Sequence, residues 1–209
     1  MPLLVLQKIN NLSKYPPRFL YRKQVKIVFP MHILNRYVGC RWNLPDGYLL
    51  RSPVDDSDTQ PWEDLLNSDL GFGPWTQERV KSDILRYLIA PDAASLLFYK
   101  DRLVGCCNTY DCSTPKKKIG KPMWLIIDED HRGRGLGRIV YFRTLAFFAR
   151  ERYQKVVGFT DPCRLTALRF YLSEGYLPAY DSLYSVIHWW KIKHRLQSAP
   201  LRVRQQNKS

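Results

Sequence analysis

The chain has 209 residues, enough for one domain with or without extensions, and its 45% hydrophobic and 13% aromatic residues argue against wholesale disorder. Its net charge of +14 lies entirely in two acid-free flanks, since residues 1–45 carry eight Lys and Arg, residues 189–209 carry six, and the residues between them are neutral. This distribution counts against a uniformly basic nucleic-acid-binding domain, and no apolar run approaches the ~18 residues of a membrane-spanning helix.

Residues 1–45 show no clear hydrophobic periodicity, and prolines at positions 16, 17 and 30 break any long helix. We therefore expect a basic N-terminal arm over 1–45, a folded domain over 46–190 and a basic C-terminal tail over 191–209. Within the domain, apolar runs between turn residues predict strands, and apolar residues at helical spacing predict helices. The expected strands are 48–51, 95–99, 103–107, 123–127, 155–160 and 184–190. The expected helices are 60–67, 76–89, 139–149 and 164–173.

Two of these segments indicate the kind of sheet. The apolar runs 95–99 and 103–107 are joined by a polar turn and predict a hairpin. The run 123–127 is apolar throughout, as expected of a central strand that is buried on both faces. Strands mixed with helices, with a hairpin near the front, predict an α/β fold with a mixed sheet.

The cysteine and histidine spacing excludes the common metal sites. The five cysteines form no Cys-x-x-Cys pair, and the four histidines show no ligand spacing, so we expect no metal. An odd cysteine count without a secretion signal is typical of a cytoplasmic protein with reduced thiols. Cys106 and Cys107 lie inside an apolar run, where small strand residues are the simpler interpretation than redox chemistry.

The segment whose residues indicate a functional site is the loop from Asp128 to Arg138, which joins a strand to the start of a helix. A helix start exposes unpaired amide N–H groups and the positive end of the helix dipole, and glycines let a backbone approach a ligand closely. Glycines at 133, 135 and 137 with arginines at 132, 134 and 138 therefore predict a cradle for a phosphate or pyrophosphate. A tight turn with solvated arginines is the alternative.

Here the sequence resembles the GNAT superfamily of N-acetyltransferases. Arg132-x-x-Gly135-x-Gly137 matches the family's acyl-CoA signature, Arg/Gln-x-x-Gly-x-Gly/Ala. The run from Ala167 to Tyr176 is similar to the family's Ala-x-x-x-Tyr-x-x-x-Gly-Phe/Tyr helix end, and Leu103-Val104-Gly105 to its hairpin strand. The resemblance covers about 47–190 and implies a mixed, mostly antiparallel central sheet flanked by helices.

The resemblance also implies a cofactor, acetyl-CoA, as acyl donor. The pantetheine arm would lie beside the backbone of Leu125, Ile126 and Ile127, where one amide would polarise the thioester carbonyl, a contact worth about 3–4 kcal/mol in the transition state. The pyrophosphate would lie on the loop, with contacts from Arg132, Gly133, Arg134, Gly135, Leu136, Gly137 and Arg138. Tyr171 would be the catalytic residue that protonates the departing thiolate. A core tyrosine beside Phe170 is the alternative for that position.

Other family features are less clear in this chain. No Glu lies within 123–127 to act as general base, although Asp111, Asp128, Glu129, Asp130 and His131 lie near enough to act through water. Relatives often carry Asn seven residues before the tyrosine, where this chain has Arg164. The acceptor pocket would be walled by aromatic residues and gated by 71–74. These aromatic residues are Trp62, Phe72, Trp75, Tyr180, Tyr184, His188, Trp189 and Trp190. Ordinary core and sheet packing is the alternative for each of them.

Two functions follow as hypotheses. The first is an acyl-CoA-dependent N-acetyltransferase that transfers an acetyl or short acyl group to a primary amine by direct attack in a ternary complex. Its amine acceptor, a small molecule or a protein, is not identified by the sequence, and a homodimer is an open alternative to a monomer. The second is a binding protein on a degenerate acetyltransferase scaffold, whose basic arms contact nucleic acid or a ribosome.

Overall fold

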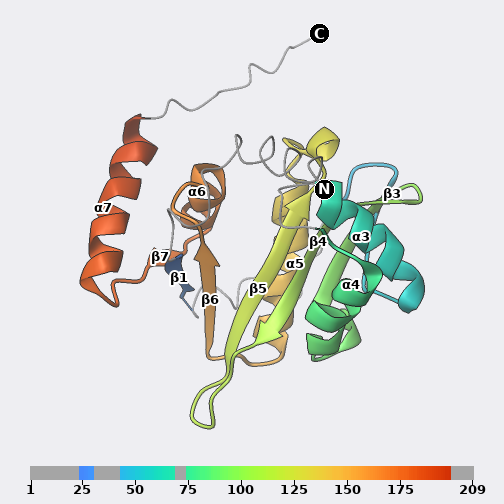
Figure 1. The fold of residues 1–209 in the computed structure, drawn as a ribbon, viewed down its shortest axis with the longest axis horizontal. Helices are drawn as coiled ribbons and strands as arrows, with labels where there is room; N and C mark the ends of the chain where they lie inside the picture. The colour runs from blue at the N-terminus through green and yellow to red at the C-terminus, as the bar shows by residue number, and fades with distance from the viewer. Residues whose placement is uncertain (1–23, 31–42, 69–73, 199–209) are drawn as a thin grey trace, which may run out of the picture.

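The computed structural model describes residues 24–30, 43–68 and 74–198, which form a seven-stranded sheet with helices on both faces (Figure 1). The strands are β1 (Val25–Phe29), β2 (Tyr48–Arg51), β3 (Ala94–Tyr99), β4 (Arg102–Asp111), β5 (Ile119–Ile127), β6 (Lys155–Thr160) and β7 (Leu177–Pro178). The α-helices are α3 (Thr59–Ser68), α4 (Gln77–Asp83), α5 (Leu136–Arg150), α6 (Leu165–Ser173) and α7 (Leu183–Ser198). Short 3-10 turns lie at Asp56–Asp58, Leu85–Tyr87, Pro91–Ala93 and Glu129–His131.

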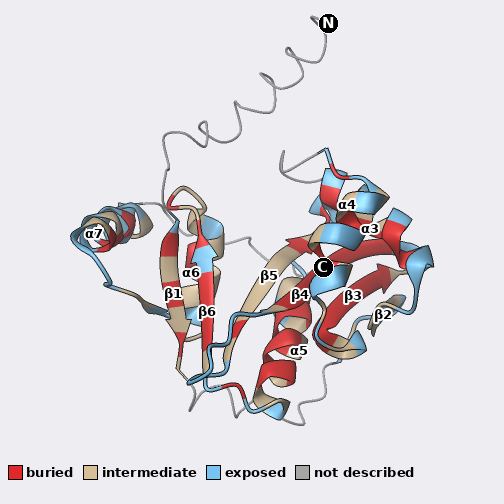
Figure 2. Cartoon of the chain, turned by 60° about the horizontal axis from the view of Figure 1, so that its bottom comes forward, coloured by how far each residue is buried: buried red, intermediate tan, exposed pale blue. Residues whose placement is uncertain are grey.

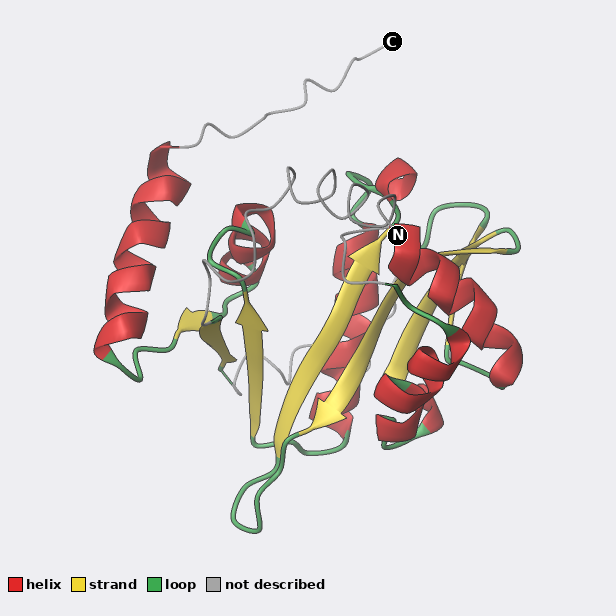
Figure 3. Cartoon of the chain, in the orientation of Figure 1, coloured by secondary structure: helices red, strands yellow, loops and turns green. Residues whose placement is uncertain are grey.

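The sheet has the strand order β2-β3-β4-β5-β6-β1-β7. Every neighbouring pair is antiparallel except β5 and β6, which run parallel. The expected mixed, mostly antiparallel sheet flanked by helices is therefore confirmed. Figure 3 shows β5 and β6 side by side at one end and separated at the other, in agreement with their pairing over only two residues of each strand.

The two faces of the sheet carry different helices. Helix α5 packs on β3, β4 and β5, and its apolar residues share one core with Val104 and Cys107. Helices α3 and α4 cover the other face and share a second core with Leu103 and Cys106. Because strand side chains alternate between faces, the neighbouring cysteines are buried in opposite cores, as small strand residues would be.

Strand β1 lies within the segment that was expected to be an arm. Val25, Ile27 and Phe29 are buried, whereas Lys26 and Val28 between them are only half-buried, so the strand has the two-residue period of a sheet with one core face. It inserts between β6 and β7. The period was present in the sequence, but only five residues carry it between long stretches without a pattern.

The segment 184–190 is a helix, so the expected final strand is wrong. Its β-branched and aromatic residues favour a strand by propensity, but Ser185, Trp189 and Ile192 recur at helical spacing and are buried on one side. Helix α7 continues to Ser198, so the folded domain extends beyond 46–190 at both ends. Here packing of one helical face overrides local propensity.

Two further elements differ in part from the expectation. The helix expected over 76–89 ends at Asp83 and continues as a 3-10 turn, although Thr76 caps its first turn through Arg79 N at 3.2 Å as expected. The central strand begins four residues earlier than expected, and most of its residues are half-buried, because one edge borders a cavity.

Candidate active site

A cavity of about 860 Å³ opens between β5 and β6. The two strands pair only through Ile119 with Lys155 and Gly120 with Val156. The backbone groups of every second residue in a strand point to the same neighbouring strand, so Pro122 occupies the position from which the next hydrogen bond to β6 would form. Proline has no N–H to donate, so that hydrogen bond is missing. Beyond this point the strands separate, and β5 with the loop after it forms one wall of the cavity.

A β-bulge lies in the wall formed by β5. Cys106 pairs with Ile126 and Asn108 with Met123, so two residues of β5, Trp124 and Leu125, lie opposite the single residue between them on β4. Trp124 takes a φ of +54°, unusual for a bulky residue, and its ring packs edge-on against Trp75 at 5.0 Å between centroids. Bulges redirect the backbone groups beside them, so the amides of β5 that follow Trp124 are turned from the regular ladder.

The loop after β5 has the glycine conformations and the helix start on which the predicted cradle depends. Gly133 and Gly135 have φ values of +77° and +78°, which side chains other than glycine rarely adopt. Gly135 is the N-cap of the 15-residue α5, and Arg138 N donates the first internal hydrogen bond back to Gly135 O at 3.0 Å. The amides of Leu136 and Gly137 therefore precede the internal ladder at the positive end of the helix. This geometry suits a phosphate group.

Nine of the ten predicted cofactor residues line the cavity: Leu125, Ile126, Ile127, Arg132, Gly133, Gly135, Leu136, Gly137 and Arg138. Arg134 is not among the lining residues, because its guanidinium donates to Tyr48 Oη at 3.2 Å and to Asp130 O at 3.3 Å. Arg132 Nε donates to Ile127 O at 2.7 Å, which fixes the start of the loop against the end of β5. Arg138 Nε pairs with Glu174 Oε1 at 3.1 Å.

Tyr171 lines the same cavity from α6. Its ring lies 5.5 Å from the rings of Tyr141 and Tyr176, and burial raises the pKa of the Tyr171 hydroxyl well above its usual value. The hydroxyl has no hydrogen-bond partner among the described residues, whereas those of Tyr141 and Tyr176 bond to each other. Tyr171 therefore stays protonated and keeps its proton available to a ligand.

Among the five residues considered as bases, only His131 lines the cavity. It is buried, and its Nδ1 hydrogen-bonds to Tyr48 Oη at 2.7 Å. Asp128 is held in an ion pair with Arg102 and accepts from Asp130 N at 3.1 Å, as a turn-capping carboxylate does. Arg164 also lines the cavity, where its Nε lies 3.5 Å from a carboxylate oxygen of Asp161.

The aromatic wall expected around the acceptor does not form, because its members are dispersed. Trp62 and Trp75 are fully buried in the core under α3 and α4, and Trp189 is buried under α7. Tyr180 and Trp190 are exposed, and Tyr184 stacks on His188 at 3.8 Å within α7. Phe72 lies outside the described residues, as do 71–73 of the gate that was expected over 71–74.

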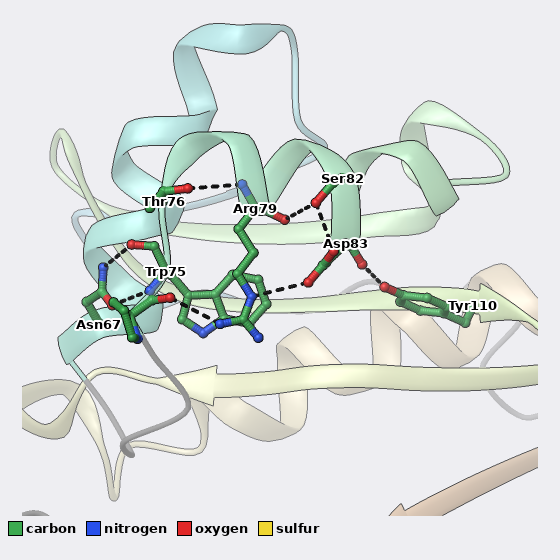
Figure 4. A network of polar contacts seen from close by, with 8 residues as sticks. Asn67, Trp75, Thr76, Arg79, Ser82, Asp83 and Tyr110 are labelled. Carbon is green, nitrogen blue, oxygen red and sulfur yellow. Dashed lines mark hydrogen bonds and ion pairs between the residues drawn. The ribbon is translucent and has the colours of Figure 1, made fainter. Parts of the chain in front are cut away.

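Figure 4 shows how firmly Trp75 is held. Asn67 Nδ2 donates to Trp75 O at 3.1 Å, and Trp75 N donates to Asn67 Oδ1 at 2.9 Å. The Arg79 guanidinium lies 4.2 Å from the centre of the Trp75 ring, and Arg79 also pairs with Asp83. Trp75 thus supports Trp124 at the bulge rather than walling an acceptor pocket.

Three features were missed by sequence reasoning. The bulge at Trp124 has no sequence signal, since it depends on the register of β5 against β4. Pro122 could have been predicted from the sequence to end the backbone hydrogen bonding between two strands. The wall formed by Phe159 and Thr160 of β6 and by Asp161 after it was not predicted as part of the site, although 155–160 was predicted as a strand. No group of three or more metal-ligating side chains occurs within the described ranges.

Known proteins resemble this chain in sequence family and in fold. The model of the acetyltransferase (GNAT) family matches residues 59–176, more than half of the chain. A search of curated proteins gave no match. Among solved structures, a GCN5-related N-acetyltransferase from Sphaerobacter thermophilus is similar at a TM-score of 0.58 and 18% identity, covering 82% of this chain and 52% of that one. The chain thus spans about half the length of that relative.

Two other solved structures are covered more fully. An acetyltransferase from Trypanosoma brucei has a TM-score of 0.52 and 17% identity, covering 65% of this chain and 96% of that one. Naa50 from Arabidopsis thaliana, in complex with the bisubstrate analogue CoA-Ac-MVNAL, has a TM-score of 0.50 and 17% identity, and the match covers 62% of this chain and 82% of that one. At these identities the structures support the fold, and the family model supports the membership. The chain belongs to the acetyltransferase (GNAT) family.

Proposed function

We propose that this protein is an N-acetyltransferase that transfers an acetyl or short acyl group from acetyl-CoA to a primary amine in a ternary complex. The observation that carries the proposal is that one cavity combines a glycine-rich helix start, a bulged strand and a buried tyrosine whose pKa is raised. Family membership supports acyl transfer from acetyl-CoA in general. The identity of the acyl group and of the acceptor belongs to the proposal.

Each part of the cavity has a role in this proposal. The pyrophosphate lies on the amides of Leu136 and Gly137, and the pantetheine arm lies between β5 and β6. A backbone amide beside the bulge donates to the thioester carbonyl and stabilises the negative charge that develops on its oxygen. The neutral amine forms a bond to the carbonyl carbon, the carbon–sulfur bond breaks, and Tyr171 gives its proton to the departing thiolate. The nitrogen, which becomes positively charged on attack, loses one proton to water, and a proton from water returns to the Tyr171 phenolate, so that the products are a neutral amide and a thiol.

The acceptor must arrive uncharged, because an ammonium group has no lone pair for the attack. His131 is the cavity residue placed to accept its proton, directly or through water, and Tyr48 orients the ring through Nδ1. Lys121 also lines the cavity, with its Nζ 5.0 Å from the centre of the Phe159 ring. This cation disfavours a polyamine, which would bring further positive charge. The peptide-bearing analogue bound to Naa50 makes a protein N-terminus a candidate acceptor.

The direct test is acetyl-CoA binding by calorimetry, followed by a thiol-release assay across amines that include polyamines, amino acids and peptides. We expect a dissociation constant between about 1 µM and 1 mM and acceptor-dependent thiol release. The absence of heat at millimolar acetyl-CoA would contradict cofactor binding. Binding without release for any amine would favour an acyl-CoA sensor on the same fold.

Cysteine alkylation provides a second prediction. Burial raises the pKa of Cys107 to about 12 and that of Cys106 further, so both should resist iodoacetamide until the chain unfolds. Cys112 is exposed and should react faster than the other three cysteines in the described part of the chain. Cys163 lines the cavity, so acetyl-CoA at about ten times its dissociation constant should slow its alkylation roughly tenfold.

Mass spectrometry of the native protein would measure each alkylation site, with Cys112 as the internal control for reagent activity. Equal rates at Cys163 with and without acetyl-CoA would place the ligand elsewhere. The low expected reactivity of the buried Cys106 and Cys107 is compatible with reduced thiols. A cytoplasmic location, where thiols stay reduced, is part of the proposal.

The alternative, nucleic-acid or ribosome binding through the basic flanks, needs its own test. Deletion of residues 1–45 is unsuitable, because it would remove β1 from the sheet. A gel-shift titration should instead compare the full chain with a chain that lacks residues 1–23, at about 50 mM salt. Equal, weak retardation of both would count against this function.

A further inference from the structure

Helix α7 has two apolar faces, only one of which meets the protein. Ser185, Trp189 and Ile192 are buried against the domain. On the other side, Leu183, Val186, Ile187 and Trp190 recur at the spacing of a helical stripe and are all exposed, Leu183 by 76% and Trp190 by 62%. We call these four residues the outer stripe. Scattered exposed apolar residues are ordinary, but a contiguous stripe marks a contact surface.

The outer stripe is bordered by positive charge. At 3.6 residues per turn, Lys191 and Lys193 fall on opposite sides of the stripe, roughly 90° and 70° from its centre. Both are exposed, as are His194 and Arg195 on the next turn. No Asp or Glu occurs between Ser182 and the end of the sequence. The outer face of α7 is therefore apolar along its middle and cationic along its borders.

The placement of α7 leaves this face accessible to a large surface. Figures 1 and 2 show α7 at the margin of the molecule in both views, with no described element outside it. Its 16 residues are about 24 Å long, less than the ~30 Å of a hydrocarbon core. Among the described helices none has the length and apolarity needed to span a membrane. The helix is thus suited to lie on a bilayer, parallel to its plane.

We propose that α7 docks the protein on an anionic membrane surface, with the outer stripe in the interface and the lysines at the lipid phosphates. Aliphatic and tryptophan side chains enter the boundary between headgroups and acyl chains, while long lysine side chains reach back to the headgroups. Anionic lipids add attraction for each nearby cation. This inference does not rest on the proposed acetyltransferase activity.

Two other occupants fit the face less well. Nucleic acid would engage the lysines, but it offers no apolar layer for Leu183, Val186 and Ile187, since only aromatic side chains stack on bases. A second copy packed through the same stripe would bring the bordering lysines of two acid-free helices together, which like-charge repulsion opposes. An anionic bilayer complements both the apolar middle and the cationic borders.

The test is flotation of the full chain with vesicles of phosphatidylcholine containing about 30% phosphatidylserine, compared with phosphatidylcholine alone. We expect binding to the anionic vesicles that weakens with salt. The double variant Ile187→Ser, Trp190→Ser should reduce the partition coefficient at least about tenfold. The double variant Lys191→Gln, Lys193→Gln should reduce it about fivefold per charge.

The matched control is Leu49→Ser, Val54→Ser, which removes two equally exposed apolar side chains from β2 and the loop after it. It should float as the wild type does, and thermal unfolding should be unchanged in all variants because no substituted side chain is buried. Failure of the wild type to float with anionic vesicles overturns the proposal, as does unchanged flotation of the stripe variant. A dimer that the stripe variant dissociates, without vesicle binding, would assign the face to a second copy instead.

Discussion

Replacing Gly135 with Leu is expected to lower acetyl-CoA affinity at least about 100-fold. Gly135 lines the cavity, and a Cβ at this position would meet no protein atom within 4 Å. A leucine side chain therefore has room in the protein but occupies the space over the cradle, where the pyrophosphate would lie. Losing two charge-assisted hydrogen bonds from amides costs about 1.5–3 kcal/mol each, which accounts for this magnitude.

The same substitution should also reduce stability modestly. The φ of +78° at Gly135 costs a residue with a side chain about 1–2 kcal/mol, which in a domain of this size lowers the melting temperature by roughly 2–8 °C. Calorimetry at a temperature well below the transition would separate lost affinity from unfolding.

Gly47→Ala is the matched control for backbone strain. Gly47 has a φ of +81° in the turn before β2, does not line the cavity, and its added Cβ would lie 3.0 Å from the Tyr99 ring. It should lose comparable stability and keep wild-type acetyl-CoA affinity. If Gly135→Leu binds acetyl-CoA as the wild type does, the loop is a structural turn and not a cradle.

The fold was predictable wherever a segment carried its own pattern. The hairpin of β3 and β4 and strand β6 are apolar runs bounded by polar residues, and helices α3, α5 and α6 have helical periodicity within the segment itself. Strand β1 was missed because its five residues lack flanking elements that would mark them, and it pairs with strands more than 120 residues away in the sequence. Helix α7 was read as a strand because its residue types favour strands while its buried positions follow a helix.

The site was predictable only where the chemistry resides in consecutive residues. The cradle needs glycines and a helix start, which the sequence displays directly. The acceptor side depends on which elements meet across the sheet, and there the expected aromatic wall did not form because Trp62 and Trp75 fill a core. Likewise, the bulge at Trp124 is a property of two strands in register, which no single segment encodes.

Replacing Tyr171 with Phe is expected to lower kcat about 100-fold while changing the acetyl-CoA dissociation constant less than about threefold. General acid catalysis typically raises a rate roughly 10²–10⁴-fold. A thiolate, whose conjugate acid has a pKa near 8.5, is a better leaving group than an alkoxide and depends less on protonation, so we expect a loss in kcat at the lower end of that range. The phenyl ring keeps the packing against Tyr141 and Tyr176 and removes only the hydroxyl.

The control is Tyr176→Phe, which removes a neighbouring buried hydroxyl that bonds to Tyr141 and does not line the cavity. It should lower stability by about 1 kcal/mol and leave kcat unchanged. The measurement is thiol release with the most active acceptor of the panel, together with calorimetry of each variant. Wild-type kcat in Tyr171→Phe would make Tyr171 a packing residue.

The pH profile separates the acid from the nucleophile. Burial raises the pKa of Tyr171 above its usual value of about 10, so the hydroxyl stays protonated and its ionisation cannot lower kcat below that pH. The acceptor amine, whose pKa is about 10 for an alkyl amine and about 8 for a protein N-terminus, gains its reactive neutral form as pH rises. Wild type and Tyr171→Phe should therefore show the same rise in rate between pH 7 and about 9.5, offset by a constant factor. A falling limb in this range that is present in the wild type and absent in the variant would mean that Tyr171 loses its proton below about pH 9.5, which would contradict the raised pKa although it would still identify Tyr171 as the acid.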